Sequence, residues 1–214
     1  MQTSARVPES TIARLPLYLR ALRAMRDSDS VSSEALARAC GVTSAQVRKD
    51  LSFVGTRGRR GVGYEVRILR DELAAELGVQ HDLPVVIIGA GNLGLALANY
   101  AGFASRGFRV VGLVDADRRR VGEPVTAELV VQPMDDLARI LKRTSCVMGV
   151  IATPEASAQS VADLLVEAGV TGILNFAPTM LTVPSHVEVR DVDLGMELQL
   201  LAFHEQQISR SGDA

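Results

Sequence analysis

Tryptophan is absent from this 214-residue chain, and aromatic residues make up only 4% of it. Hydrophobic residues still account for 47% of the chain, so a substantial core can form from Leu, Val, Ala and Ile. A chain of this length has room for two small domains or one large one.

Cysteine is also scarce, since Cys40 and Cys146 are the only two and lie far apart. Their separation does not match the spacing of metal ligands and favours two buried thiols in a reducing cytoplasm. The first ten residues lack the apolar segment of a secretory signal. No apolar run reaches the ~18 residues of a membrane span. The sequence therefore predicts a soluble, cytoplasmic protein with neither a metal site nor a membrane partner.

Lysine occurs only at Lys49 and Lys142, so Arg supplies nearly all of the positive charge. The formal net charge of −2 conceals an asymmetry. Residues 1–70 hold 13 Arg and Lys against 6 Asp and Glu, whereas residues 71–214 hold 10 against 19. A basic segment joined to an acidic body indicates that the first part binds a polyanion. A basic face exposed to solvent explains the charge equally well.

Short helices are expected in the basic segment. Apolar residues at helical spacing indicate the first helix, and they are Leu15, Leu19, Leu22 and Met25. A second helix over residues 33–40 has Ser32 or Ser33 as its N-cap and Gly41 at its end.

A third helix begins after Thr43, and Gln46 follows at the position that completes a capping box. A loop rich in Gly and Arg comes next, over residues 54–64. An alternating pattern typical of a strand follows the loop, carried by Tyr64, Val66 and Ile68. A short helix is expected over residues 71–77. This order of elements predicts a winged helix-turn-helix domain, whose third helix lies in the major groove of DNA.

The residues expected to contact DNA lie on the third helix and on the loop after it. Gln can pair with adenine, Arg with guanine and Lys with phosphate. Arg in a glycine-flanked loop suits phosphates or a narrow minor groove. The set comprises Ser44, Gln46, Arg48, Lys49, Arg57, Arg59, Arg60 and Gly61. The alternative is a small dimerisation module with an arginine-rich surface.

Strands and helices alternate in the rest of the chain, a pattern that predicts a doubly wound parallel sheet. The expected strands are residues 85–88, 110–114, 128–131, 147–151, 172–175 and 187–189. The expected helices are residues 92–101, 134–143, 155–168 and a tail helix over 194–209. The predicted domains are a winged-helix domain over 1–80, a nucleotide-binding domain over 81–191 and a C-terminal helix and tail over 192–214.

The first of these strands leads into a glycine-rich turn. The residues fit the pattern G-x-G-x-x-G, which gains its meaning when it follows a strand and opens a helix; they are Gly89, Ala90, Gly91, Asn92, Leu93 and Gly94. Gly89 permits the turn, Gly91 lets a pyrophosphate approach the backbone, and Gly94 lets the helix pack on the strand. The pattern predicts a Rossmann-like dinucleotide site, with a glycine-rich turn that binds nothing as the alternative.

Asp115 ends the next strand, where an acid accepts hydrogen bonds from ribose hydroxyls and favours NAD(H) over NADP(H). Arg118, Arg119 and Arg120 follow it, and an Arg cluster can receive a phosphate. A turn exposed to solvent is the simpler interpretation of these arginines.

A series of motifs resembles the Rex family of bacterial redox-sensing transcriptional repressors. The motifs are VTSAQVRKDLS at 42–52, RGVGY at 60–64, GAGNLG at 89–94, IATP at 151–154, ILNFAP at 173–178 and VDL at 192–194. The resemblance covers nearly the whole chain. It implies a homodimer with a domain-swapped C-terminal helix that binds palindromic operator DNA. It also implies that NAD permits DNA binding and that NADH releases the DNA.

The resemblance further implies roles for residues that carry no signal of their own. Cofactor contacts are expected from Thr153, Pro154, Asn175 and Phe176 beside the glycine turn. A polar switch that couples the domains is expected from Arg20, Tyr100 and Asp193. The chain departs from the family pattern at Val54 and Arg57, where aromatics are common, and at Leu194, where some members place Phe.

An NAD-dependent oxidoreductase is the main alternative function. Such an enzyme needs a substrate pocket and a proton donor or acceptor. The two predicted domains leave room only for a tail helix, and no histidine has a neighbour that marks a catalytic base; the histidines are His81, His186 and His204. A CoA-ligase-like fragment explains the glycines but gives the basic segment no role. The sequence therefore predicts a repressor rather than an enzyme.

Overall fold

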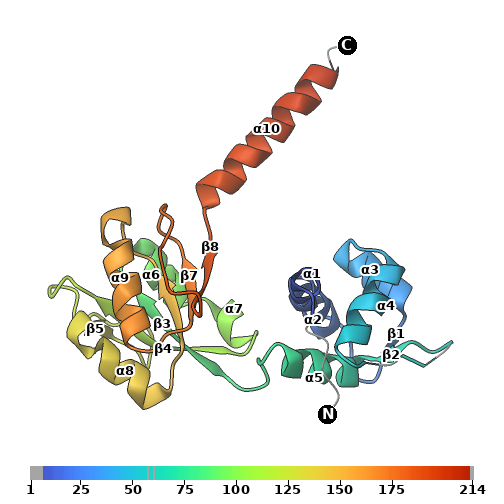
Figure 1. Ribbon diagram of the computed structural model, residues 1–214, viewed down its shortest axis with the longest axis horizontal. Coiled ribbons are helices and arrows are strands. Elements are labelled where there is room, and N and C mark those ends of the chain that lie inside the picture. Colours follow the sequence, from blue (N-terminus) through green and yellow to red (C-terminus); the bar gives the residue numbers. More distant parts are fainter. Residues whose placement is uncertain (1–6, 57, 60, 213–214) are drawn as a thin grey trace. The chain divides into compact units, whose positions relative to one another are not determined.

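The computed structural model describes residues 7–56, 58–59 and 61–212 (Figure 1). The chain divides into two compact units between His81 and Asp82. None of the helices in the described part of the chain combines the length and apolar character that crossing a membrane requires.

The first unit is a helical domain with a two-stranded sheet (Figure 1). Its elements are α1 (Glu9–Ile12), α2 (Leu15–Arg23), β1 (Ser30–Val31), α3 (Ser33–Cys40), α4 (Ser44–Phe53), β2 (Tyr64–Glu65) and α5 (Val66–Glu76). Strands β1 and β2 pair antiparallel, with Val31 opposite Tyr64. All of the longer helices contribute to one apolar core, which includes Leu22, Leu36, Leu51 and Leu73.

The ends of α3 are as the sequence predicts. The Ser32 hydroxyl accepts the Ala35 N–H at 3.1 Å, and Gly41 ends the helix in the left-handed conformation, with φ of +68°. A side chain at Gly41 would be strained because only Gly adopts this conformation without cost.

The strand expected from Tyr64, Val66 and Ile68 is wrong beyond Glu65. Helix α5 begins at Val66, well before the helix predicted at 71–77. Val66, Leu69 and Leu73 are all buried at helical spacing, whereas Ile68 is 42% exposed. Alternation over a few residues fits the first turn of a helix as well as a strand, and burial against the core decides between them.

The second unit is built on a six-stranded, fully parallel sheet in the order β5-β4-β3-β6-β7-β8. The strands are β3 (Leu83–Ile88), β4 (Phe108–Asp115), β5 (Val131–Pro133), β6 (Met148–Ile151), β7 (Gly172–Asn175) and β8 (Glu188–Asp191). Counted along this unit, the order is 3-2-1-4-5-6, which is the arrangement of dinucleotide-binding folds.

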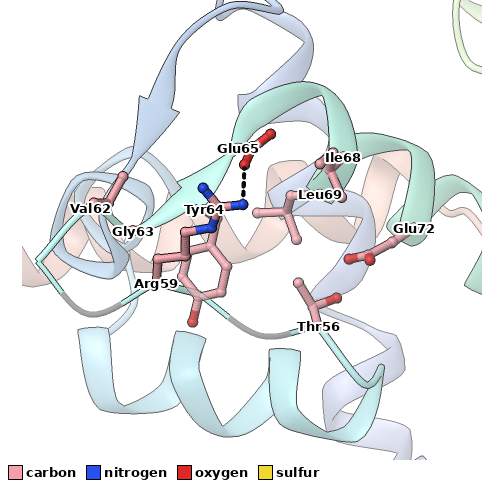
Figure 2. Close-up of a pocket in the computed structure, with 9 residues that line it drawn as sticks. All are labelled: Thr56, Arg59, Val62, Gly63, Tyr64, Glu65, Ile68, Leu69 and Glu72. Atoms are coloured by element: carbon pink, nitrogen blue, oxygen red, sulfur yellow. Dashed lines mark ion pairs between the residues drawn. The ribbon is translucent and has the colours of Figure 1, made fainter.

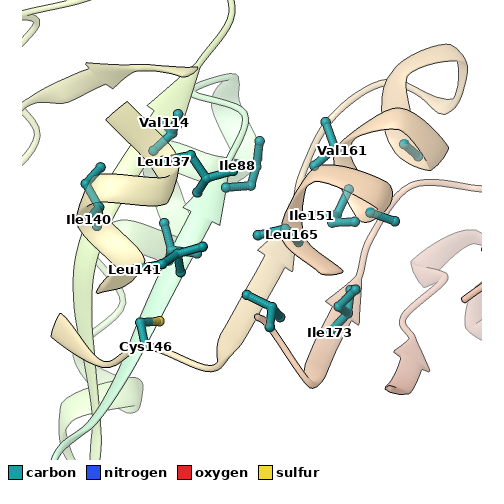
Figure 3. Close-up of a cluster of buried hydrophobic side chains, with 14 of the residues drawn as sticks. Ile88, Val114, Leu137, Ile140, Leu141, Cys146, Ile151, Val161, Leu165 and Ile173 are labelled. Carbon is teal, nitrogen blue, oxygen red and sulfur yellow. The ribbon is translucent and has the colours of Figure 1, made fainter. Parts of the chain in front are cut away.

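Helices cover both faces of the sheet (Figure 1). They are α6 (Asn92–Ala98), α7 (Ala101–Ala104), the 3₁₀ turn η1 (Met134–Asp136), α8 (Leu137–Thr144) and α9 (Glu155–Glu167). The C-terminal helix α10 (Leu194–Gly212) instead extends away from the sheet, and its described side chains are exposed (Figure 1). Figure 3 shows the core on the α8 and α9 side, where Leu141 and Leu165 lie over the strands. A second core forms on the opposite face, where Leu95 of α6 packs near Ile87 and Leu113. The doubly wound sheet is therefore confirmed.

Most predicted elements of this unit differ from the observed ones by a few residues at their ends, and three differences have a structural reason. The helix expected at 92–101 is two helices, because Tyr100 has extended backbone angles and interrupts it. The strand expected at 128–131 is β5, which begins at Val131 because Val130 instead bridges Pro124. The helix expected at 134–143 begins with the turn η1.

Both cysteines are free thiols. Cys146 is buried, and its thiol donates to the carbonyl oxygen of Pro84 at 3.1 Å. Burial raises the pKa of Cys146, which keeps this thiol protonated and unreactive. Cys40 is half-buried, so the prediction of two buried thiols is correct only for Cys146.

Two adjacent leucines of α9 test this packing. Leu165 is completely buried in the core of Figure 3, whereas Leu164 is 43% exposed. We expect Leu165→Ala to lower the free energy of unfolding by about 2–5 kcal/mol because it leaves a cavity. Leu164→Ala is the matched control and should cost far less. Denaturant titration of both variants measures the difference, and equal losses would contradict the assigned face of α9.

Candidate nucleotide and DNA sites

The nucleotide site is expected where the strand order reverses, between β3 and β6. The glycine turn follows β3, and Thr153 follows β6. A Cβ placed on Gly89 would lie 2.5 Å from the carbonyl oxygen of Ala152 and 3.2 Å from Cγ2 of Thr153. Two segments distant in sequence, both predicted to contact the cofactor, therefore lie against each other at the carboxyl end of the sheet.

The three glycines of the turn have different surroundings. Gly89 has φ of +102°, and a Cβ on Gly94 would overlap the carbonyl oxygen of Gly89. These two positions have no room for a side chain, because the loop after β6 lies against Gly89 and α6 packs its Gly94 directly against the turn. A Cβ on Gly91 meets nothing within 4 Å, so the backbone there faces open space. An open backbone at this position leaves room for a pyrophosphate.

Asp115 links the glycine turn to the end of β4. One carboxylate oxygen accepts the Ala90 N–H at 2.6 Å, and the other accepts the Asp117 N–H at 2.7 Å. Each oxygen of a carboxylate has two acceptor positions, so both retain capacity for a ribose hydroxyl. The residue predicted to contact the ribose thus also holds the turn in place.

The arginines after Asp115 point to different partners. Arg118 pairs with Asp135 at 3.7 Å, and Arg119 pairs with Asp117 at 2.8 Å. Arg120 donates to the carbonyl oxygen of Ala90 at 2.7 Å. The three side chains do not converge on one phosphate position, which favours the interpretation as a turn.

Thr153 carries a polar atom without a partner. Its hydroxyl oxygen is buried and has no hydrogen bond within the part of the chain that the structure describes. Buried polar atoms in native proteins are nearly always satisfied by protein, water or ligand. The Thr153 hydroxyl, beside Gly89, is therefore available to a partner that the structure does not contain. Pro154 follows it, is exposed, and starts α9 as its N-cap residue.

Asn175 is fully buried, and its amide is already hydrogen-bonded. The amide nitrogen donates to the carbonyl oxygen of Thr179 and to the carboxylate of Asp191, both at 2.8 Å. The amide oxygen accepts the Ala177 N–H at 3.0 Å. Asn175 therefore shapes the loop after β7, and Phe176 beside it packs half-buried on the α6 side of the sheet.

The three predicted switch residues are all exposed. Arg20 lies on α2 of the first unit. Tyr100 of the second unit stacks edge-to-face on Phe103, with ring centroids 5.4 Å apart. The Asp193 carboxylate accepts the N–H groups of Gly195 and Met196 at 2.8 and 3.0 Å and so caps α10. Their joint action as a switch stays a prediction.

One face of α4 is exposed and basic. The exposed residues recur at helical spacing and are Ala45, Arg48, Lys49 and Ser52. The Arg48 guanidinium donates to the Ser33 hydroxyl at 2.9 Å and lies 3.5 Å from Glu34. Among the predicted DNA contacts on this helix, Arg48 and Lys49 lie on the exposed face, whereas Ser44 and Gln46 are half-buried at its edge.

The wing is a short hairpin closed by Arg59 and Gly63, whose backbone groups hydrogen-bond to each other at 2.7 and 2.9 Å. Figure 2 shows Arg59 paired with Glu65 at 3.4 Å, beside a cavity of about 140 Å³ at the base of the hairpin. Gly61 has φ of +81° at the tip. The other predicted DNA contacts of the wing, Arg57 and Arg60, lie outside the described residues.

An aromatic side chain, that of Tyr64, packs at the base of the wing. Tyr64 is buried at the base of the hairpin, and a Cβ on Gly58 would lie 3.0 Å from its ring. Val54 packs half-buried against the core of the first unit.

Asp50 is a site residue that the sequence analysis missed. It is completely buried, and its carboxylate accepts hydrogen bonds from four side chains. These side chains lie on α1, on α2 or at its N-cap, and on α4. The donors are Thr11 at 3.0 Å, Arg14 at 2.7 and 2.9 Å, Tyr18 at 2.7 Å and Gln46 at 2.9 Å. A signal was present: Val47, Asp50 and Leu51 share one helical face, so Asp50 had to face the core.

The surroundings of Asp50 keep it ionised. Burial opposes the charge, but the hydrogen bonds from Arg14, Tyr18, Gln46 and Thr11 outweigh burial and hold the pKa of Asp50 well below its ordinary value. The hydrogen bond to Asp50 likewise raises the pKa of Arg14. Burial, together with the negative charge of Asp50, raises the pKa of Tyr18.

The contact with Asp50 corrects one prediction about Gln46. Thr43 caps α4 as expected, because its hydroxyl accepts the Gln46 N–H at 3.1 Å. The Gln46 side chain donates to Asp50 and does not return to the N-cap, so only half of the expected capping box is present.

Comparisons with known proteins agree with this geometry. A family model described as "Putative DNA-binding protein N-terminus" matches residues 6–52, and one described as "CoA binding domain" matches residues 80–179. The redox-sensing transcriptional repressor Rex of Streptomyces avermitilis is 60% identical over 94% of this chain and 80% of the relative. The chain belongs to the Rex family. Rex of Carboxydothermus hydrogenoformans is 47% identical over 93% of the chain and 96% of the relative.

Solved Rex structures have the same fold. The Rex-family repressor RSP in complex with β-NAD⁺ and operator DNA is 34% identical, covers 98% of both chains and has a TM-score of 0.86. RSP in complex with β-NADH is 33% identical, covers 97% of this chain and 99% of RSP, and has a TM-score of 0.82. The two-domain Rex architecture is thus established for this chain. Its curated relatives are repressors rather than enzymes, which removes the support for an oxidoreductase.

Acid sensitivity tests the role of Asp50. A carboxyl whose folded-state pKa is depressed stabilises the protein above its unfolded pKa of about 4, and this contribution is lost as pH falls through the folded-state value. We therefore expect the wild type to lose stability below pH ~4 more steeply than Asp50→Asn. Asp29→Asn, at an exposed position, should follow the wild type. Denaturant titration at several pH values measures the slopes, and parallel curves for all three proteins would refute the paired charge.

Proposed function

We propose that this chain is a homodimeric repressor that binds palindromic operator DNA with its first unit and leaves the DNA when its second unit binds NADH. The observation that carries the proposal is the glycine turn where the strand order reverses, which is open at Gly91 and lies at Gly89 against Thr153, whose buried hydroxyl has no partner among the described residues. The same chain carries a winged helix-turn-helix with an exposed basic helix face. The RSP complexes with NAD⁺ and operator DNA and with NADH support the same pairing of ligands.

The cofactor site uses residues from both sides of the crevice. The glycine turn and its flanking residues line the pyrophosphate position, and they are Gly89, Ala90, Gly91, Asn92, Leu93 and Gly94. Asp115 accepts the ribose hydroxyls, and the Thr153 hydroxyl donates to the dinucleotide beside Pro154. Asn175 holds the loop that presents Phe176 toward the nicotinamide end. When bound, the cofactor supplies a ring that is cationic when oxidised and neutral when reduced.

The preference for NADH follows from the apolar side chain of Phe176 at the nicotinamide end of the site. Moving the cationic, oxidised ring from water to an apolar surface costs free energy. The neutral, reduced ring does not incur this cost. Discrimination of ~100-fold requires a differential binding free energy of ~2.7 kcal/mol. Coupling of this kind is reciprocal, so operator DNA must weaken NADH binding by the factor by which NADH weakens DNA binding.

Helix α10 provides the dimer contact. Its apolar residues are more than half exposed within one copy of the chain; they are Leu194, Met196, Leu198, Leu200, Leu201, Phe203 and Ile208. At 3.6 residues per turn these residues form two stripes on nearly opposite sides of the helix. Two stripes of exposed large apolar side chains on one helix indicate binding surfaces. A helix with two apolar stripes fits between two surfaces of a second copy, as in a domain swap.

On DNA, the exposed face of α4 lies in the major groove and the wing lies along the backbone. Arg48 and Lys49 provide the contacts of the helix, with Ser44 and Gln46 at its edge. Arg59 and Gly61, with Arg57 and Arg60, provide those of the wing. Arg20, Tyr100 and Asp193 couple this unit to the cofactor domain of the dimer.

The function is tested by a fluorescence-anisotropy titration of a labelled palindromic duplex, with NADH, NAD⁺ and NADPH added separately at fixed salt. We expect NADH alone to release the DNA. Thr153→Val should need ~5-fold more NADH for release, because a hydrogen bond is worth on the order of 1 kcal/mol. Thr144→Val is the control, since that hydroxyl donates to the Ile140 carbonyl on α8.

DNA binding that ignores all three nucleotides would refute redox sensing. Equal NADH affinity with and without saturating duplex would refute the coupling, because reciprocity is a thermodynamic necessity.

The dimer contact is tested on α10. We expect Leu198→Asp to shift the protein from dimer to monomer at micromolar concentration, because it places a charge in an apolar stripe. Gln199→Asp changes the adjacent exposed residue and should leave the dimer intact. Sedimentation velocity measures both variants. A Leu198→Asp protein that remains as dimeric as the control would rule out this contact.

A further inference from the structure

Gln46 stands in the first turn of α4, the part of a recognition helix that contacts base edges. Its amide nitrogen donates to the Oδ1 oxygen of Asp50 at 2.9 Å. The side chain is half-buried, so one end of its amide lies against the domain and the rest faces the surface of the helix.

The partner of Gln46 determines which way its amide turns. An ionised carboxylate only accepts hydrogen bonds, so only the nitrogen end of the amide can face it. Asp50 is itself immobilised by hydrogen bonds from Thr11, Arg14 and Tyr18, and it is completely buried. The Gln46 oxygen and the second N–H of the amide are therefore the groups left for an external partner.

We propose that Asp50 is a positioning residue that locks the Gln46 amide, so that α4 presents the Gln46 carbonyl oxygen to DNA and selects adenine at one position of each operator half-site. Adenine offers an N6 amino donor and an N7 acceptor in the major groove, which match the Gln46 oxygen and its remaining N–H. Guanine and thymine offer no amino donor in the major groove. This inference rests on the proposed function, because it requires α4 to lie in the groove.

The experiment is a selection by the full-length protein, saturated with NAD⁺ at fixed salt, from duplexes with randomised inverted half-sites, followed by sequencing of the bound fraction. We expect the wild type to enrich adenine at one position of each half-site. Gln46→Ala should lose that enrichment, on the order of 10-fold. The enrichment should be unchanged at the other positions.

Two further variants separate locking from general support of the fold. Asp50→Asn is expected to reduce the adenine preference, because its amide can donate to the Gln46 oxygen or accept from its nitrogen. Gln46→Glu keeps the donors Thr11, Arg14 and Tyr18 of Asp50 but replaces the contact of Gln46 with repulsion between two carboxylates, which turns the new side chain away from Asp50. We expect preference at this position to move to cytosine, whose N4 amino group pairs with a carboxylate.

Tyr18→Phe is the matched control. It removes a hydrogen bond to the other carboxylate oxygen, Oδ2, and leaves the contact between Gln46 and Oδ1 in place. This variant should weaken binding to all duplexes alike and retain the adenine preference, as expected for a purely structural contact.

The outcomes distinguish the inference from the function on which it rests. A wild-type protein that enriches no inverted repeat overturns both. A clear operator with no Gln46-dependent position, or with guanine or thymine at that position, overturns only the inference. If Tyr18→Phe and Gln46→Glu alter base preference in the same way, the lock is also overturned, because loosening of the cluster would then explain both.

Discussion

The buried carboxylate of Asp50 determines the geometry of the DNA-binding unit. A charge removed from water is tolerated only when it is paired and hydrogen-bonded. The partners of Asp50 come from three helices. Thr11 lies on α1, Arg14 is the N-cap residue of α2, Tyr18 lies within α2, and Gln46 lies on α4 itself. All of them are within reach only when the helices pack in one arrangement. The contacts that satisfy the charge therefore hold α4 against the unit and leave its opposite, basic face exposed.

In the second unit the comparable constraint is the close approach of backbones where the strand order reverses. The positions of Gly89 and Gly94 have no room for a Cβ, so β3, α6 and the loop after β6 come together without intervening side chains. Asp115 holds the same turn from the end of β4. The turn that results is open at Gly91, and the loop after β6 carries the buried Thr153 hydroxyl, which has no partner among the described residues. Its shape thus follows from the packing that holds the sheet and helix together.

Helix α10 is the part of the fold that one copy of the chain leaves incomplete. The apolar area that it exposes is unfavourable in water, and in the proposed dimer that area is buried against a second copy. In the proposed dimer, this helix reaches the partner, and it is capped by Asp193, a residue expected to take part in the switch. Dimerisation and the response to NADH would then use the same segment, which is how a local change in the cofactor could alter the spacing of two recognition helices.

The sequence by itself determined the features that depend on neighbouring residues. The caps at Ser32 and Thr43, the glycine turn and most of the buried strands are local, because each follows from residue types within one turn or one strand. It could not decide between strand and helix after Glu65, where burial of Val66, Leu69 and Leu73 against distant helices sets the outcome. The helical spacing of Asp50 indicated that it faces the core but not which groups surround it, because its donors Thr11, Arg14 and Tyr18 lie more than 30 positions earlier. Only tertiary packing brings such groups together. The hydrogen-bond partners that stabilise a buried charge are its neighbours in space and not its neighbours along the chain.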